Sequence, residues 1–208
     1  MESHPGGRGR EMSRLAREVE ACAKCGLAAG RTRVVVGEGC LEGGVVLVGE
    51  APGRREDEAG RPFVGYAGRV LDQLLEEAGL SRLEVYITNL VKCRPPGNRR
   101  PRKGEVQACS GYLERQLRIL EPKVVATLGN TSLAFFQERY GLTRQPIGKT
   151  HGKPQPVEEE WGIVFLLPLY HPAAAIYNKS LRRTLLEDLR VLARLRLHAL
   201  GGVDPEQG

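Results

Sequence analysis

The chain has 208 residues, enough for one globular domain with short tails but not for two domains of ordinary size. Hydrophobic residues make up 41% and charged residues 27%, which excludes a disordered chain, a collagen-like repeat and a small disulfide scaffold. The net charge is +6 and 24 of the 31 cations are arginine, which is only weak evidence for a polyanionic partner such as nucleic acid.

The hydropathy pattern gives no sign of membrane insertion or export. No uninterrupted apolar run approaches the roughly 18 to 20 residues that a membrane helix needs. Residues 1–10 are polar and contain Gly and Arg, unlike a secretory signal. We therefore expect a cytoplasmic protein without a membrane partner. It is predicted to form one domain over residues 11–200, with flexible tails at 1–10 and 201–208.

Helix and strand patterns alternate along the chain. Helices are predicted where apolar residues recur every three or four positions, and strands where short apolar runs end at Gly or Pro. In chain order, the pattern predicts a helix over 11–29, a strand over 45–48, a helix ending near Gly79, a strand over 85–91, a helix ending before Pro122, a strand over 124–128, a helix over 131–140, a strand over 163–167 and a helix over 181–200. This alternation predicts an α/β fold with a mainly parallel sheet covered on both faces.

The segments that follow the predicted strands are the candidate ligand-binding loops. In open α/β sheets, ligands bind beyond the carboxyl ends of the strands. This rule selects residues 49–65, 89–103, 129–131 and 171–180.

The first of these loops, 49–65, contains four glycines and two prolines, which can shape a turn whose backbone N–H groups approach a ligand. Glu50 and Glu56 supply carboxylates, and Phe63 supplies a flat apolar surface. A long solvated loop with acidic residues before a helix has the same composition, so composition leaves both interpretations open.

The second loop contains a basic segment, residues 92–103, with six cations, three prolines and no acid. Because prolines stiffen the chain, the segment is predicted to display its cations as a phosphate-contact surface, although many charge runs are only solvated faces. The candidate DNA contacts are Arg94, Arg99, Arg100, Arg102 and Lys103. Asn89 ends the preceding strand, where its amide could offer a donor and an acceptor to a base edge or could simply fix the loop.

His171 lies at the end of the last predicted strand and is followed by Pro172. A histidine fixed in this way can act as an electrophile or a proton donor. The alternative is a histidine that is satisfied within the core, which is the usual outcome for a lone histidine.

The cysteine spacing indicates a metal centre. Cys22 and Cys25 form a C-x2-C pair, and Cys93 and Cys109 could complete a set of four. Ligation by thiolates alone suits either zinc or an iron–sulfur cluster, and the spacing does not distinguish them. Cys40 is left over as a small buried or partly exposed thiol.

Together these motifs resemble the family-4, iron–sulfur uracil-DNA glycosylases of bacteria and archaea. The resemblance covers about residues 15–195. It depends on the four spaced cysteines, on His171-Pro172, and on the motifs GEAPG at 49–53, GRPFVG at 60–65 and YITNLVKCRPP at 86–96. It implies a three-layer α/β/α sandwich with a central four-stranded parallel sheet. It also implies a structural [4Fe–4S] cluster on the four spaced cysteines.

The resemblance further implies that uracil is extruded from DNA into a pocket. The backbone of Glu50 and Ala51 would line this pocket, Phe63 would stack on the base, Asn89 would read the uracil edge and His171 would donate to the uracil O2. Ala51 stands where the best-known uracil glycosylases have an Asp, so no general base is expected there. Glu50 or Glu56 could take its place, or Glu56 could exclude the thymine methyl group.

The sequence departs from many relatives after Pro172. Ala173 and Tyr177 stand where those relatives carry Ser and Arg, which puts a DNA contact in doubt. The nearby Lys179 and Arg182, with Arg183 beside them, are expected to compensate. Residues 97–104 lack the histidine through which a related group traps its product covalently, so turnover is predicted.

These observations predict a monomeric, monofunctional glycosylase that removes uracil from single- or double-stranded DNA and leaves an abasic site. The alternatives are a non-enzymatic iron–sulfur DNA-binding accessory of repair or replication, and a covalent uracil-DNA-trapping relative. The first alternative has no need of Phe63, Asn89 and His171 at one sheet edge, so the pattern favours the enzyme.

Overall fold

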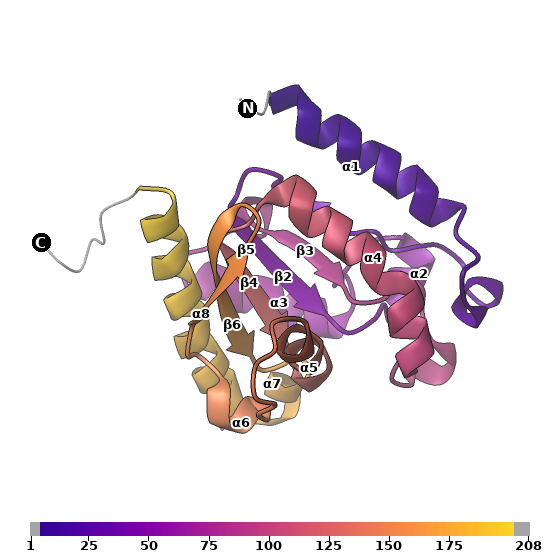
Figure 1. The fold of residues 1–208 in the computed structure, drawn as a ribbon. Helices are drawn as coiled ribbons and strands as arrows, with labels where there is room; N and C mark the ends of the chain where they lie inside the picture. The colour runs from indigo at the N-terminus through magenta and orange to yellow at the C-terminus, as the bar shows by residue number, and fades with distance from the viewer. Residues whose placement is uncertain (1–4, 202–208) are drawn as a thin grey trace, which may run out of the picture.

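The computed structural model describes residues 5–201, so the predicted tails at 1–4 and 202–208 lie outside the described residues (Figure 1). Residues 5–10, predicted to be flexible, instead form the first turns of helix α1 (Pro5–Glu20). Arg8 holds this end of the helix through ion pairs to Glu42 and Glu121, which are distant in sequence. The prediction of a flexible segment over 5–10 is therefore wrong.

Within residues 5–201, six strands form one sheet in the order β1-β3-β2-β4-β6-β5. The strands are β1 (Glu38–Gly39), β2 (Val45–Gly49), β3 (Tyr86–Asn89), β4 (Val124–Leu128), β5 (Gln155–Glu159) and β6 (Gly162–Leu169). The central part of the described sheet, β3-β2-β4-β6, is parallel, which confirms the predicted core of four parallel strands. The edge strands β1 and β5 pair antiparallel, so the whole sheet is mixed and not purely parallel as predicted.

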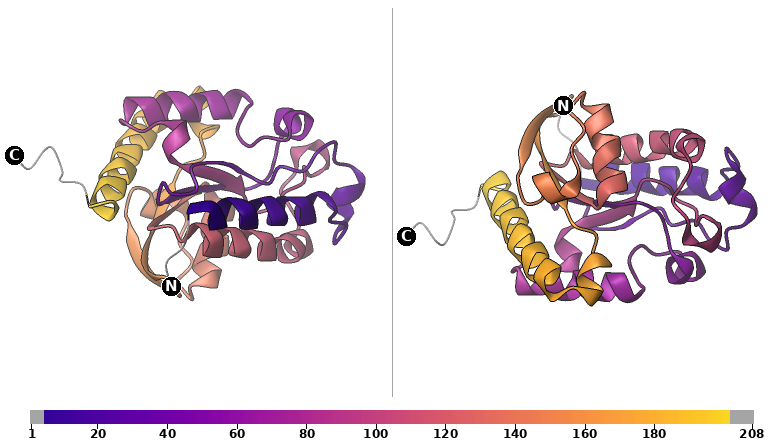
Figure 2. Two further views of the ribbon diagram at one scale, coloured as in Figure 1. Left: turned by 90° about the horizontal axis from the view of Figure 1, so that it is seen from above. Right: turned by 90° about the horizontal axis from the view of Figure 1, so that it is seen from below.

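Helices cover both faces of the sheet. They are α1, α2 (Arg54–Ala59), α3 (Tyr66–Glu77), α4 (Lys103–Leu120), α5 (Asn130–Arg139), α6 (Ile147–Thr150), α7 (Ala174–Tyr177) and α8 (Lys179–Ala199), with the 3-10 turns η1 (Gly26–Ala29), η2 (Arg82–Glu84) and η3 (Pro96–Asn98). The apolar faces of α1, α4 and α5 pack on one side, and those of α3 and α8 on the other. Figure 2 shows the sheet between these two layers, as the three-layer prediction requires. None of the helices in residues 5–201 is long and apolar enough to cross a membrane.

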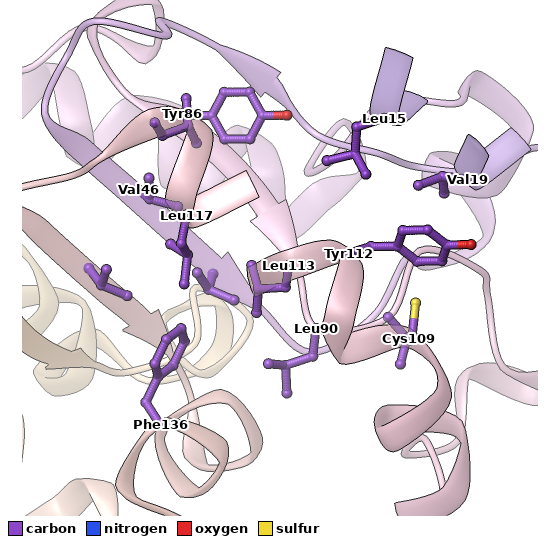
Figure 3. Close-up of a cluster of buried hydrophobic side chains, with 14 of the residues drawn as sticks. Leu15, Val19, Val46, Tyr86, Leu90, Cys109, Tyr112, Leu113, Leu117 and Phe136 are labelled. Carbon is purple, nitrogen blue, oxygen red and sulfur yellow. The ribbon is translucent and has the colours of Figure 1, made fainter. Parts of the chain in front are cut away.

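The apolar pattern of β2 explains how one strand serves both layers. Every residue of β2 is buried, and successive side chains point to opposite faces of the sheet. Val46 contributes to the layer of α1 and α4, and Leu47 to the layer of α3 and α8. Figure 3 shows the first cluster, in which Leu117 of α4 lies close to Val46 of β2 and Val19 of α1 lies close to Tyr112 of α4.

The strand register brings the predicted ligand-binding loops together. The parallel pairing of β2 with β3 sets Gly49 beside Asn89, and that of β4 with β6 sets Leu128 beside Leu169. The carboxyl ends of the four parallel strands therefore share one edge of the sheet. The chain segments that follow these strands all begin at that edge.

The cations of the basic segment were predicted to face solvent. Lys92, the first of them, is instead fully buried. Its Nζ donates to Thr88 Oγ1 at 2.7 Å, to the Asn89 carbonyl at 2.8 Å and to Gln116 Oε1 at 2.6 Å. Burial lowers the pKa of Lys92 to about 7. The ammonium group thus ties the end of β3 to helix α4.

We expect Lys92→Met to destabilise the fold by about 2 to 5 kcal/mol, because the buried acceptors on Thr88 and Gln116 would lose their amine donor. Urea unfolding measures this loss directly. Lys103→Met, at an exposed position of the same segment, is the matched control and should change stability by less than about 0.5 kcal/mol. Equal effects of the two substitutions would contradict the structural role of Lys92.

Candidate functional site

A pocket of about 650 Å³ lies at the carboxyl edge of the parallel strands. The predicted catalytic and base-contacting residues all line it, together with part of the basic segment: Glu50, Ala51, Glu56, Phe63, Asn89, Arg99, Arg100 and His171. The volume lies within the range of small-molecule sites and holds a nucleobase with room for its sugar.

Asn89 places an unused acceptor in this pocket. Its side chain is buried, and Oδ1 has no hydrogen-bond partner among the described residues. Gly49 makes room for it: a Cβ at Gly49 would lie 2.3 Å from Asn89 Oδ1 and 2.8 Å from the Phe63 ring. Because a buried carbonyl oxygen without a partner is costly, this atom is suited to accept from an N–H of a ligand.

Phe63 and His171 place two rings side by side in the pocket wall. Their centroids are 5.7 Å apart and their planes differ by 35°. Phe63 is 7% exposed and has a left-handed backbone, with φ of 50°, which is uncommon for a residue other than glycine. A planar ligand that entered the pocket would meet the Phe63 ring and the edge of the imidazole.

The hydrogen bonding of His171 selects its tautomer. The Ala173 N–H donates to His171 Nδ1 at 3.1 Å, so the neutral ring carries its proton on Nε2. Burial lowers the pKa of His171, while the charge of Glu56 acts in the opposite direction. The site therefore offers a neutral imidazole with one N–H available for donation.

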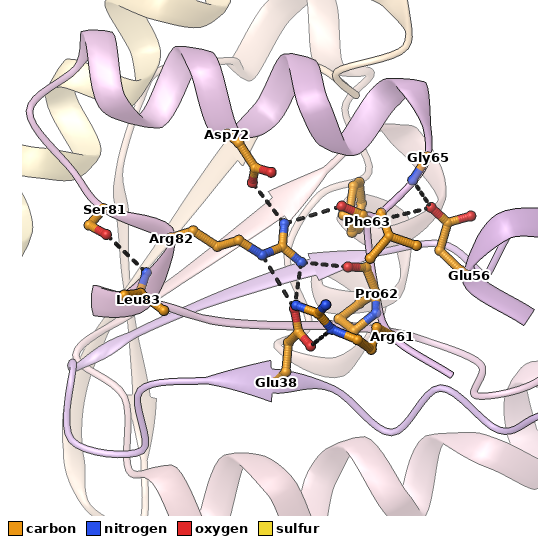
Figure 4. Close-up of polar contacts among 11 residues, drawn as sticks. Glu38, Glu56, Arg61, Pro62, Phe63, Gly65, Asp72, Ser81, Arg82 and Leu83 are labelled. Atoms are coloured by element: carbon orange, nitrogen blue, oxygen red, sulfur yellow. Dashed lines mark hydrogen bonds and ion pairs between the residues drawn. The ribbon is translucent and has the colours of Figure 1, made fainter. Parts of the chain in front are cut away.

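Glu56 takes a structural part in the loop. Its Oε1 accepts from the Val64 N–H at 2.9 Å and from the Gly65 N–H at 2.7 Å, which ties α2 to the turn that follows Phe63 (Figure 4). Glu50 also lines the pocket, and its backbone carbonyl accepts from the Val91 N–H at 3.3 Å. These are the two carboxylates that the pocket contains among the described residues.

The composition of the basic segment indicates a row of free cations, but some of these cations already have partners within the protein. Arg99 forms a bidentate ion pair with Glu105, an acid just beyond the segment, at 2.7 and 2.8 Å. Arg94 donates from Nε to Asn98 Oδ1 at 2.7 Å. Arg100, Arg102 and Lys103 are exposed, and Arg100 lines the pocket mouth.

The opposite side of the pocket mouth carries α7 and the start of α8. Lys179 is exposed, whereas Arg182 pairs with Glu77 at 2.6 Å and Arg183 pairs with Glu187 at 3.1 Å. Tyr177 is 94% exposed. Of the cations predicted to compensate at this side, Lys179 is therefore the most readily available to a ligand.

A second cavity, on the α1 side of the basic segment, is lined by all four spaced cysteines: Cys22, Cys25, Cys93 and Cys109. Three N–H groups point at their sulfurs. Arg31 Nη1 donates to Cys93 Sγ at 3.3 Å, the Lys92 N–H to Cys109 Sγ at 3.3 Å and the Lys24 N–H to Cys22 Sγ at 3.5 Å.

The thiols that line this cavity are the donor set of a metal centre held by thiolates, which suits either zinc or an iron–sulfur cluster. Within residues 5–201, no three His, Cys, Asp or Glu side chains converge as ligands of one metal ion. N–H···S bonds such as these three are common at metal centres held by thiolates. Burial raises the pKa of Cys93, and Arg31 opposes this by favouring its thiolate. Cys40 lies outside this cavity.

Several residues that shape the site have no signal in the sequence. Arg31, Lys92 and Arg82 act through contacts that the fold creates, and each is indistinguishable in sequence from a solvated cation. Tyr170 also lines the pocket, but it lies just after the end of β6 and resembles an ordinary core residue in sequence. Among these residues, only Gly49 had a signal in the sequence, because it is a glycine at the end of a predicted strand.

Comparisons of the sequence with known proteins find several similar chains. The profile of the uracil DNA glycosylase superfamily matches residues 36–191. The chain is 44% identical to a type-4 uracil-DNA glycosylase of Sulfurisphaera tokodaii over 187 residues, covering 89% of this chain and 85% of the relative. It is also 44% identical to the type-4 enzyme of Thermotoga maritima, covering 86% and 91% of the two chains. A type-5 uracil-DNA glycosylase of Thermus thermophilus is 37% identical, covering 67% and 68%.

We expect His171 to titrate below its ordinary pKa of 6.5, because burial disfavours the charged ring and Ala173 already occupies Nδ1. Above this pKa the ring is neutral, with the proton on Nε2. Nitrogen-15 NMR of the imidazole across a pH series reports both the midpoint and the tautomer. Glu56→Gln should move the midpoint further down, because it removes a negative charge. A midpoint at or above 6.5, or a proton on Nδ1, would contradict this assignment.

Proposed function

Because this chain belongs to the uracil DNA glycosylase superfamily, we propose that it removes uracil from DNA by hydrolysis of the N-glycosidic bond and leaves an abasic site. One observation carries the proposal. A single pocket joins the unpartnered Asn89 Oδ1, the Phe63 ring and the Nε2–H of a neutral His171.

Asn89 and Phe63 account for base selection. Extrusion of a nucleotide costs a few kcal/mol of stacking and pairing, which contacts in the pocket must offset. The ring of Phe63 would stack on the base, while Asn89 Oδ1 would accept from the uracil N3–H and its amide would donate to O4. Cytosine has no hydrogen on N3, so it would leave the buried Asn89 oxygen unpaired. That unpaired acceptor is the source of discrimination.

His171 accounts for stabilisation of the leaving group. As the bond between sugar and base breaks, the sugar becomes cationic and the uracil becomes anionic, with charge on O2. A fixed Nε2–H donor at this oxygen binds the transition state more strongly than the ground state. Because Nδ1 accepts from the Ala173 N–H, the neutral ring keeps its proton on Nε2, from which it can donate to O2.

Water activation makes a smaller contribution in this proposal. Ala51 provides no carboxylate, and Glu56 already uses Oε1 to hold the loop. We therefore assign orientation of the attacking water to Glu50, with most of the rate coming from stabilisation of the departing uracil. No lysine lines the pocket among the described residues, which agrees with a monofunctional glycosylase without lyase activity.

The exposed cations on both sides of the pocket mouth would contact the DNA backbone. On one side lie Arg100, Arg102 and Lys103, and on the other lies Lys179. Arg94 and Arg99 would contact DNA while they keep their hydrogen bonds to Asn98 and Glu105. Such contacts add affinity without base specificity. Because one chain supplies the whole pocket, we propose a monomer acting in the cytoplasm, where a bacterial or archaeal genome lies.

The four-cysteine cavity would hold a [4Fe–4S] cluster through Cys22, Cys25, Cys93 and Cys109. The cluster would supply a rigid cross-link and not a reaction step. Its ligands join the segment after α1, the start of the basic segment and helix α4. Arg31 reinforces this join, since it also donates to the Cys22 carbonyl at 2.8 Å.

Wild-type protein should convert a uracil-containing oligonucleotide into an alkali-cleavable product. His171→Ala should reduce the single-turnover rate by about 10² to 10³, the usual effect of losing one oxyanion-type donor. His198→Ala, at an exposed position of α8, is the control and should retain the wild-type rate. Absence of product from both single-stranded and duplex uracil DNA would overturn the proposed function.

Cys93→Ser should lower the bound iron and sulfide of the purified protein and reduce its thermal stability, because the cross-link would lose one ligand. Iron analysis, visible absorption and the melting temperature measure these effects. Cys40→Ser, which changes a thiol outside the cavity, should leave all three unchanged. Unaltered iron content in Cys93→Ser would remove Cys93 from the ligand set.

A further inference from the structure

The backbone of Phe63 is held in an unfavourable conformation. For a residue with a side chain, the left-handed region costs on the order of 1 to 3 kcal/mol, and it persists only where the surroundings enforce it. The Phe63 ring lies against Gly49 on one side. On the other side, α3 approaches so closely that a Cβ at Gly68 would lie 1.8 Å from the Phe63 carbonyl oxygen. The direction of the ring therefore depends on what fixes this carbonyl.

Arg82, in the turn η2, binds the loop from behind. Its Nη1 donates to the Phe63 carbonyl at 3.2 Å, and its Nη2 donates to the Pro62 carbonyl at 2.5 Å (Figure 4). One planar guanidinium thus holds two successive carbonyls of the strained turn. Arg82 does not itself line the pocket.

The guanidinium of Arg82 is fixed in turn by two acids from other elements. Nη1 donates to Asp72 Oδ1 of α3 at 2.8 Å, and Nε and Nη2 donate to Glu38 Oε1 of β1 at 3.3 and 2.9 Å. Arginine has five N–H donors, and these contacts together with the two carbonyls make five hydrogen bonds. The side chain is 19% exposed, so solvent weakens these contacts less than at an open surface.

We propose that Arg82 is a positioning residue for base stacking: by clamping the Pro62 and Phe63 carbonyls, it aims the Phe63 ring into the pocket. This inference rests on the proposed function, because it assigns Arg82 an effect on uracil excision through Phe63. By the same argument, the edge strand β1 supports the site, since its Glu38 holds the Arg82 guanidinium in place. Lysine cannot fully replace Arg82, because a single ammonium group cannot donate in the planar geometry of a guanidinium.

Arg61 provides a matched control within the same cluster. It also pairs with Glu38, at 2.7 Å, but its side chain is 62% exposed and, among the described residues, it makes no hydrogen bond to a loop carbonyl. Arg61→Gln and Arg82→Gln therefore remove the same charge beside the same acid. They differ in whether the Phe63 turn is released.

Steady-state excision of uracil from an oligonucleotide tests the proposal. Arg82→Gln should lower kcat/KM by about tenfold to a hundredfold, as a small displacement of a positioning group does. Arg61→Gln should stay within about twofold of wild type. Arg82→Lys should give an intermediate loss. A wild-type rate in Arg82→Gln, or an equal loss in Arg61→Gln, would overturn the role of Arg82.

A double-mutant cycle with Phe63→Leu separates positioning from general stability. If Arg82 acts through the ring, Arg82→Gln should change kcat/KM by less than about twofold once the ring is absent. Its effect on the melting temperature should remain in that background. A loss of kcat/KM that is undiminished in the Phe63→Leu background would mean that Arg82 does not act through Phe63.

Hydrogen exchange of the Val64 and Gly65 amides gives a readout that does not depend on activity. Arg82→Gln should accelerate exchange at these amides, and Arg61→Gln should not. If wild-type protein releases no uracil, the proposed function fails while this result still tests the clamp. If Arg82→Gln does not fold, Arg82→Lys supplies both measurements, and wild-type exchange together with wild-type kcat/KM in that variant overturns the proposal.

Discussion

The pocket depends on the absence of a side chain at Gly49. The register of β2 with β3 places Gly49 beside Asn89, and the Phe63 ring reaches the same point from the following loop. Any Cβ there would collide with both side chains. The parallel sheet thus does more than bring loops to one edge, because its register decides which backbone position lies against Asn89. The Asn89 side chain and the Phe63 ring can meet at this position only because it is a glycine.

The chain that continues from β3 joins this pocket to the cysteine cavity. Within a short stretch, residues 89–93, it supplies the Asn89 amide, the buried Lys92 and the Cys93 thiol. Lys92 contacts both sides, because its Nζ donates to the Asn89 carbonyl and its backbone N–H donates to Cys109 Sγ. The cysteine cavity is therefore connected over a few bonds to the residue proposed to read the base. The cluster proposed for this cavity would act on recognition without contact with the ligand.

The parts of the fold and site that sequence could predict are those encoded locally. The four central strands are continuous apolar runs, and the rule that ligands bind at strand ends is enough to assign Phe63, Asn89 and His171 to one edge of the sheet. Strands β1 and β5 were missed because β1 has two residues and β5 is largely exposed and polar. The contact of Arg82 with Phe63 spans 19 residues and that of Arg31 with Cys93 spans 62, so no local pattern records them.

The arginine content of the chain consequently has two separate explanations. Some of the arginines bind groups within the protein. The guanidinium groups of Arg82 and Arg31 donate to carbonyl oxygens or to sulfur, and that of Arg99 donates to a carboxylate. These side chains are held by the fold and add little free charge to its surface. The charge that we propose to face DNA comes instead from a few exposed cations around the pocket mouth, such as Arg100 and Lys179. Net charge counts both groups equally, which is why it predicts a polyanionic partner only weakly.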